Sequence, residues 1–299
     1  MRIDAHHHLW DLSRRPQPWM DGPWADPLRR TFAPADLEPE LTAHGVDMSV
    51  AVQTSTSYDE TRDLLATAGG SGWIAAVVGW ADLTDPGLPA VLAGLRSAPG
   101  GDRLRGIRHQ VQDEPDPLWL VRPEVRRGLA AVADAGLVYD LLVTPRELPA
   151  AIEAVREVPQ LTFVLDHAGK PAVAERLWQP WADGITELAG EPHVSCKLSG
   201  LVTEADWQKW RPQEVLPYAH HVLDAFGPHR VLFGSDWPVC TLAADYREVL
   251  ALAEQATAHL TVLERAAVFG DTAARVYGLE TAWRRPGDAA QSRRPPEHG

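Results

Sequence analysis

Short apolar runs alternate with segments of helical period along almost the whole chain. Eight runs have the length and apolar content of buried strands, and apolar positions three or four residues apart between them predict helices. Most of these helical segments end just before a glycine, where a left-handed cap is favoured. The expected strands cover residues 3–6, 48–53, 74–80, 104–111, 137–143, 162–166, 194–198 and 231–233. Eight strands with helices between them predict an α/β fold, a single-domain (β/α)₈ TIM barrel, and the length of 299 residues fits one.

A doubly wound open sheet is the alternative fold. Such a sheet would need a glycine-rich phosphate loop after its first strand. Here that place holds His6, His7 and His8, so the barrel is preferred.

Two segments depart from a minimal barrel. Residues 9–33, rich in Trp and Pro, follow the first strand. Loops after barrel strands lie on the catalytic face, so we expect this long loop to cover the pocket. Residues 284–299 have the composition of a disordered tail, which leaves 1–283 as the expected barrel domain.

Composition narrows the class of protein. Apolar residues make up 45% and charged residues 23%, an ordinary globular balance, and the formal charge is −13. No dense basic stripe precedes the last sixteen residues, which argues against nucleic-acid partners. With no secretory or membrane-spanning run, we expect a cytoplasmic protein without membrane partners; a homo-oligomer remains open.

The chain begins with a histidine triplet at the end of its first strand. In an extended strand alternate side chains share a face, so His6 and His8 point one way and His7 the other. Two imidazoles on one face can hold a metal or can together donate hydrogen bonds to a carbonyl oxygen. A remnant of an affinity tag would be longer and would not follow Ile3-Asp4 directly.

Polar residues also gather where four further strands end. The motifs are Gly106-Ile107-Arg108-His109, Asp166-His167-Ala168-Gly169-Lys170-Pro171, Lys197-Leu198-Ser199-Gly200 and Gly234-Ser235-Asp236-Trp237-Pro238. In a barrel the carboxyl ends of all strands meet at one face, where active sites lie. Five such clusters are therefore hard to explain by core packing alone.

With Ile3-Asp4-Ala5-His6-x-His8-x-Trp10, these motifs resemble the amidohydrolase superfamily. The resemblance is to the amidohydrolase-2 branch, which contains sugar-acid lactonases of the L-fuconolactonase-like and L-rhamnonolactonase-like kind, and it spans residues 3 to about 280. By resemblance, His6, His8, His167 and Asp236 fall on positions that bind a metal or a carbonyl group and activate water.

The chain departs from the binuclear members of that superfamily. Those take a bridging Lys or Glu from strand four and a His from strand five, whereas this chain offers Arg108 and His109 on strand four and no His on strand five. A two-metal centre is not expected. Two alternatives stay open: one divalent ion, expected to be zinc, on His6 and His8 with His167 or Asp236, or a site that works without metal.

The resemblance implies a hydrolase that opens a sugar-derived lactone, a small-molecule substrate. The expected catalytic residues are Asp236, the general base, and His167, which with His6 and His8 polarises the carbonyl. Expected substrate contacts come from Arg108, His109, Lys170, Trp10 and Trp237. Lys197 either projects into the barrel or forms a structural ion pair.

Two other functions compete with the lactonase. One is a metal-dependent decarboxylase of the same superfamily, acting on an aromatic or muconate-type acid. The other is a non-catalytic binding protein that keeps the barrel, which Asp236 argues against because binding alone has little use for a base. A serine lactonase is excluded because no Gly-x-Ser-x-Gly elbow is present.

Overall fold

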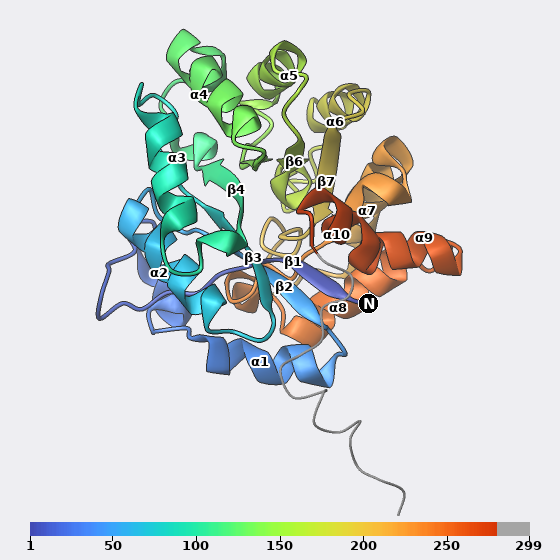
Figure 1. The fold of residues 1–299 in the computed structure, drawn as a ribbon. Coiled ribbons are helices and arrows are strands. Elements are labelled where there is room, and N and C mark those ends of the chain that lie inside the picture. Colours follow the sequence, from blue (N-terminus) through green and yellow to red (C-terminus); the bar gives the residue numbers. More distant parts are fainter. Residues whose placement is uncertain (280–299) are drawn as a thin grey trace, which may run out of the picture.

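The computed structural model describes residues 1–279, in which eight parallel strands follow one another in chain order around a single sheet (Figure 1). The strands are β1 (Ile3–His7), β2 (Met48–Val52), β3 (Ile74–Gly79), β4 (Leu104–His109), β5 (Val138–Leu141), β6 (Phe163–Leu165), β7 (Val194–Leu198) and β8 (Val231–Phe233). The helices are α1 (Pro34–Ala43), α2 (Tyr58–Gly69), α3 (Leu88–Ser97), α4 (Pro123–Asp134), α5 (Leu148–Glu157), α6 (Trp181–Ala189), α7 (Pro212–Phe226), α8 (Tyr246–Ala256), α9 (Val262–Ala266) and α10 (Thr272–Val276). The expected tail, 284–299, lies outside the described residues.

The two ends of the sheet meet just beyond β1 and β8. The amide of His8 donates to the carbonyl of Trp237 at 2.7 Å, and the amide of Asp236 donates to the carbonyl of His6 at 2.8 Å. These bonds nearly close the ring of strands. The TIM barrel is therefore confirmed, and the doubly wound sheet was the wrong alternative.

The strands are shorter than the apolar runs that predicted them. The runs 104–111 and 137–143 contain β4 and β5, which end at His109 and Leu141. Val111 and Leu142 are buried all the same, because they pack in the loops above the barrel. A hydrophobic pattern reports burial, so it cannot separate the end of a strand from a buried loop.

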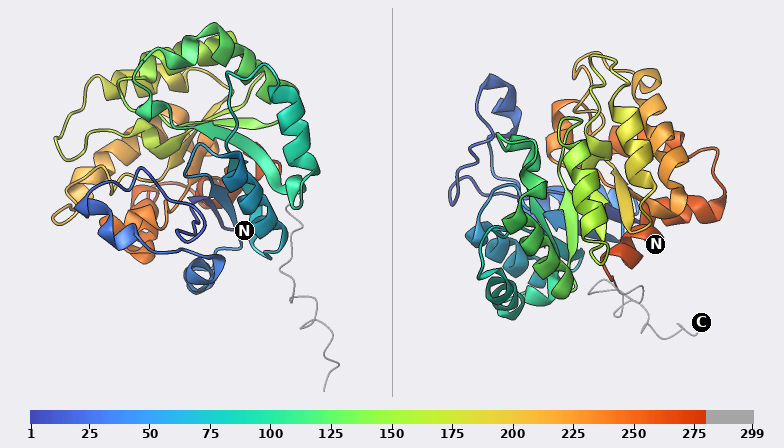
Figure 2. Two further views of the ribbon diagram at one scale, coloured as in Figure 1. Left: turned by 90° about the vertical axis from the view of Figure 1, so that its left-hand side faces the viewer. Right: turned by 90° about the horizontal axis from the view of Figure 1, so that it is seen from above.

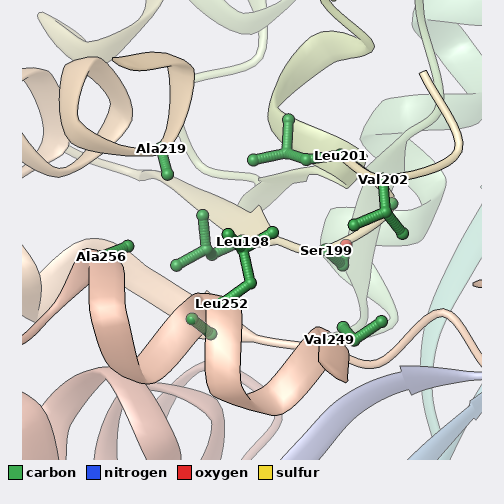
Figure 3. Close-up of a pocket in the computed structure, with 10 residues that line it drawn as sticks. Leu198, Ser199, Leu201, Val202, Ala219, Val249, Leu252 and Ala256 are labelled. Atoms are coloured by element: carbon green, nitrogen blue, oxygen red, sulfur yellow. The ribbon is translucent and has the colours of Figure 1, made fainter. Parts of the chain in front are cut away.

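The helices cover the outside of the sheet and leave little empty space against it. A cavity of about 20 Å³ lies between β7 and the facing sides of α7 and α8. Figure 3 shows the residues that line it. Its lining is apolar apart from Ser199, and it includes Leu198, Ala219 and Leu252. A space of this size holds no more than about one water molecule, so it belongs to the packing of the barrel.

Helix α10 packs against the barrel near the amino ends of its strands, where Tyr277 is fully buried. Its hydroxyl lies 3.1 Å and 3.0 Å from the two carboxylate oxygens of Asp140, on β5. We expect Tyr277→Phe to lower the free energy of unfolding by about 1.5–3 kcal/mol, the range for hydrogen bonds to charged groups. Urea unfolding measures this. Tyr218→Phe, which removes a 3.3 Å bond to a neutral carbonyl, is the matched control and should cost about 1 kcal/mol.

The segment 9–33 rises from the carboxyl end of β1. Figure 2 shows it in dark blue, extending beyond the barrel on the side away from the N-terminus. Two backbone bonds between Trp10 and Phe32 hold its base together, and Pro23–Leu28 form a short 3₁₀ helix near its tip. No helix in residues 1–279 combines the length and apolar character needed to cross a membrane.

Candidate active site

Three histidine rings and one carboxylate converge at the carboxyl ends of β1, β6 and β8. His6 and His8 come from β1 and the residue after its end, and their Nε2 atoms lie 3.2 Å apart. The ring of His7 points away and its Nε2 lies 2.8 Å from the Ser49 hydroxyl, as strand alternation predicts. The Oδ1 atom of Asp236 lies 3.4 Å from Nε2 of His8 and 3.9 Å from Nε2 of both His6 and His167.

Both His167 and Asp236 sit on left-handed backbone, with φ of 51° and 57°. Left-handed residues reverse the chain sharply after a strand and so turn these side chains toward the barrel axis. Gly200, with φ of 64°, leaves room for the His167 ring: a Cβ there would lie 2.6 Å from Nδ1 of His167. The turn after β6 and the loop after β7 are therefore fitted to each other.

Neighbouring groups hold the ring orientations. Nδ1 of His8 lies 2.8 Å from the carbonyl oxygen of Val52, which can only accept, so that nitrogen carries the proton. A neutral His8 thus turns the lone pair of Nε2 toward Asp236. Nδ1 of His167 lies 2.9 Å from the Ser199 hydroxyl, which can donate or accept, so this contact leaves the tautomer of His167 open.

The burial of the cluster shifts its proton affinities. Burial lowers the pKa of His167 to about 4, against the opposing charges of Asp236 and Asp166, so its ring is neutral at pH 7. Burial alone would raise the pKa of Asp236, but the favourable electrostatic interaction with the neighbouring rings of His167 and His8 outweighs it, and the pKa lies below the ordinary value. Asp236 is consequently ionised at neutral pH.

A network of buried charges lies directly beneath the cluster. The Lys197 ammonium, on β7, is fully buried between Asp140 Oδ2 at 2.5 Å and Asp166 Oδ1 at 2.9 Å. Arg108 binds the other oxygen of Asp166 at 2.9 Å. Each buried charge has a partner of opposite sign, which such a charge requires. Both alternatives expected for Lys197 therefore hold at once, because its side chain projects into the barrel and forms ion pairs there.

The converging nitrogen and oxygen atoms suit a single divalent ion. Ligands about 2.0–2.1 Å from a tetrahedral zinc lie roughly 3.4 Å from one another, and nitrogen with carboxylate oxygen is a donor set that zinc accepts. The separation of 3.2 Å between His6 and His8, and the separations of 3.4–3.9 Å from Asp236 to the three histidines, are close to that value. His6, His167 and Asp236 can each offer a ligand atom within 4.8 Å of the others. The residues therefore fit the metal.

Above the cluster opens a cavity of about 340 Å³. Its floor includes His8, Arg108, His167 and Asp236. Its walls are Trp19, Trp24, Thr54, Gln110, Gln112, Asp113, Leu142, Lys170, Thr203, Glu204, Trp207, Val239 and Leu242. The volume lies at the small end of the range for ligand pockets. Two of the wall residues, Trp19 and Trp24, belong to the long loop after β1, as the sequence predicted.

Three residues expected to contact a substrate lie outside this lining. His109 stacks on Trp119 at 4.3 Å and faces Glu114 at 2.7 Å. The indole of Trp10 donates to the carbonyl of Arg30, and Trp237 packs edge-on against Phe32 at 5.3 Å. They support the loops around the cavity, whereas Arg108 and Lys170 do line it.

Other lining residues carried no signal in the sequence. Trp207 follows β7 by nine residues and meets Trp24 of the long loop, with ring centroids 6.0 Å apart. Glu204 pairs with Lys170 at 2.9 Å. Both belong to an irregular loop, whose path hydrophobic periodicity does not predict.

A (β/α)₈ barrel with histidines after β1 and β6 and an aspartate after β8 is the arrangement of the amidohydrolase class of hydrolases. The chain belongs to that family: the amidohydrolase family model matches residues 3–279. The chain is 44% identical to an L-fucono-1,5-lactonase of Burkholderia multivorans over 93% of its own length and 96% of the relative's. An L-fucono-1,5-lactonase of Burkholderia ambifaria is 41% identical over the same shares of both chains.

Solved structures agree with this assignment. A crystal structure of an amidohydrolase from Burkholderia multivorans with bound zinc has a TM-score of 0.88 and 43% identity, over 94% of this chain and all of that one. A second crystal form of that protein, with the same scores, holds HEPES. A 5-carboxyvanillate decarboxylase from Sphingomonas paucimobilis shares the fold, with a TM-score of 0.64 at 16% identity over 94% of this chain and 99% of that one.

Proposed function

We propose that this hydrolase opens a sugar-derived lactone, an aldonolactone, by attack of water on the ring carbonyl. The observation that carries the proposal is the ionised Asp236 at the floor of the cavity, facing three histidine nitrogens within 3.9 Å. Relatives at 41–44% identity that carry the name L-fucono-1,5-lactonase support the same substrate class.

Asp236 acts in both halves of the proposed reaction. Its carboxylate takes a proton from water as the oxygen attacks the carbonyl carbon. The bond between that carbon and the ring oxygen then breaks, and Asp236 returns the proton to the ring oxygen, which stays attached to the hydroxy-acid product. His6, His8 and His167 would polarise the carbonyl oxygen as ligands of one divalent ion; without an ion, His167, whose tautomer is open, is the ring that can donate to that oxygen directly. Such an ion supplies a Lewis acid for that oxygen.

The charges of the cavity favour a neutral substrate over the carboxylate that a decarboxylase would bind. Within the described part of the chain its lining cations are Arg108 and Lys170, and each already pairs with an acid, Asp166 and Glu204 respectively. Asp113, Glu204 and Asp236 outnumber these cations. Among residues 1–279 the cavity offers a substrate carboxylate no cation that is free of an acidic partner, whereas substrate hydroxyl groups can bind Gln110, Gln112 and Thr54.

A pH-indicator assay over γ- and δ-aldonolactones tests the proposal, using chelator-treated and zinc-loaded protein. Stereoselective acid release above the spontaneous rate is the expected result. The two metal states separate direct polarisation from polarisation through an ion. No turnover of any lactone in either state, together with loss of CO₂ from an aromatic acid, would establish the decarboxylase instead.

The tryptophans at the mouth should determine affinity more than rate. We expect Trp207→Ala to raise KM about tenfold and leave kcat within about twofold, because the ring lies on the cavity wall and not among the converging atoms. Steady-state kinetics on the best lactone measures both constants. Trp178→Ala is the control, since this ring packs on Trp181 and Tyr218 outside the cavity. A fall in kcat alone for Trp207→Ala would contradict this assignment.

A further inference from the structure

Each nitrogen of the His6 ring has two partners that compete for it. Nδ1 lies 3.1 Å from the Lys197 ammonium and 3.4 Å from Oδ1 of Asp166. Nε2 lies 3.2 Å from Nε2 of His8 and 3.4 Å from Nη1 of Arg108. A neutral imidazole has one N–H and one lone pair. Each nitrogen of His6 can therefore bond only one of its two partners, and the position of the proton decides which partner that is at both nitrogens.

In the first arrangement the proton is on Nε2. Lys197, which can only donate, then donates to Nδ1, and Nε2–H donates to the lone pair that His8 presents. The Nδ1–H of His8 donates in turn to the carbonyl of Val52. Hydrogen bonds run in one direction from Lys197 to Val52, and every donor and acceptor along the chain is matched.

In the second arrangement the proton is on Nδ1. It can be donated to Asp166 at 3.4 Å, and Nε2 accepts from Arg108 at 3.4 Å or binds a metal. Without a metal, two lone pairs face each other 3.2 Å apart on His6 and His8, and the Lys197 ammonium faces an N–H. Metal ligation removes the first conflict because both lone pairs then point at the ion, but it leaves the second.

We propose that Lys197 is a positioning residue that sets the tautomer of His6: it keeps the proton on Nε2 in the metal-free protein and thereby opposes metal binding at this ring. It acts through His6 and has no place in the cavity lining. Because both His8 and Lys197 favour the same tautomer, Nε2 of His6 carries its proton, and donates it to His8, when no ion is bound. Asp166 and Arg108 stabilise the tautomer that an ion requires.

Two features show that Lys197 cannot simply turn away. It is fully buried, and its ammonium is held by Asp140 at 2.5 Å and Asp166 at 2.9 Å. Asp140 is fixed from the opposite side by Tyr277. The positive charge of Lys197 therefore stays close to Nδ1 whichever tautomer is present. A metal at Nε2 has to bind while this ammonium faces the Nδ1–H of the same ring.

The first test reads the rings themselves, in unmodified metal-free protein with ¹⁵N-labelled histidine. Long-range ¹H–¹⁵N spectra distinguish the two neutral tautomers, and the His6→Gln spectrum assigns the ring. We expect His6 protonated at Nε2, changing to Nδ1 on addition of one equivalent of zinc. A metal-free His6 protonated at Nδ1 would overturn the proposal. This reading is independent of turnover, so it stands or falls separately from the lactonase proposal.

The second test measures zinc affinity by competition with a chromophoric chelator. We expect Lys197→Met to bind zinc about tenfold more tightly, the scale on which groups behind metal ligands act. That change alone leaves two buried carboxylates with fewer cations. The paired variant Lys197→Met/Asp140→Asn also removes one carboxylate, so it keeps the net charge of the network and should show the same gain. Asp140→Asn alone, which keeps the ammonium beside His6, is the control. Equal affinity in the wild type and the paired variant would refute the role of Lys197.

Discussion

Asp236→Asn should lower kcat/KM for the best lactone by about a thousandfold, within the range over which a general base contributes. Asparagine keeps the size of the side chain and tolerates the left-handed backbone at this position, φ 57°, so the fold should survive. The amide cannot take a proton from water and cannot return one to the ring oxygen. Initial rates of acid release, with circular dichroism to verify folding, measure the effect.

Asp113→Asn is the matched control for that experiment. Asp113 lines the same cavity, from the short helix after β4, and is not part of the converging cluster. Removing its charge tests whether the reaction needs only a negative charge somewhere in the cavity, or a carboxylate placed to act as a base at the substrate carbonyl. Comparable losses in the two variants would show that general electrostatics, and not proton transfer by Asp236, drives the reaction.

The barrel could be predicted because its signals are local. Each buried strand is a short apolar run, and most helices carry an amphipathic period and an end signal, so eight occurrences of this pattern define the fold without any long-range information. The ends of the strands were less well determined. Val111 and Leu142 continue the apolar runs beyond β4 and β5 because they are buried in loops, a distinction that periodicity does not make.

The cluster at the floor of the cavity could be anticipated for a topological reason. Parallel barrel strands deliver their carboxyl ends to one face, so His6, His167 and Asp236 had to lie near one another once the strands were placed. No such topological reason predicts which residues form the walls of the cavity. Trp207 and Glu204 reach the cavity through the path of one irregular loop, and His109 turns away to stack on Trp119.

Lys197 illustrates a further limit of the sequence. A lysine in an apolar strand is equally compatible with a site residue and with a structural ion pair. Only the positions of Asp140 on β5 and Asp166 after β6, strands that precede β7 around the barrel, place its ammonium 3.1 Å from His6. That contact depends on side-chain rotamers from four separate strands, which spacing within one strand does not determine.

Gly200→Ala should reduce kcat/KM about a hundredfold although it changes no polar group. An added Cβ would lie 2.6 Å from Nδ1 and 2.7 Å from Cγ of His167, closer than real contacts allow, so the ring must move. Displacing a group at the reacting centre by about 1 Å is enough for a loss of this size. The shift would also break the 2.9 Å contact between His167 and Ser199, which holds the ring. Lactone kinetics and urea unfolding together measure the outcome.

Gly136→Ala separates the clash from backbone strain. Gly136 has nearly the same left-handed backbone, with φ of 63° against 64° for Gly200, but apart from its chain neighbours no atom of residues 1–279 lies within 4 Å of its added Cβ. Both variants should therefore lose about 1 kcal/mol of stability from the strained backbone, and only Gly200→Ala should lose activity. If Gly136→Ala lost as much activity, general destabilisation would be the cause. If Gly200→Ala kept full activity, the position of the His167 ring would not matter to the reaction, and its role in polarising the carbonyl would have to be given up.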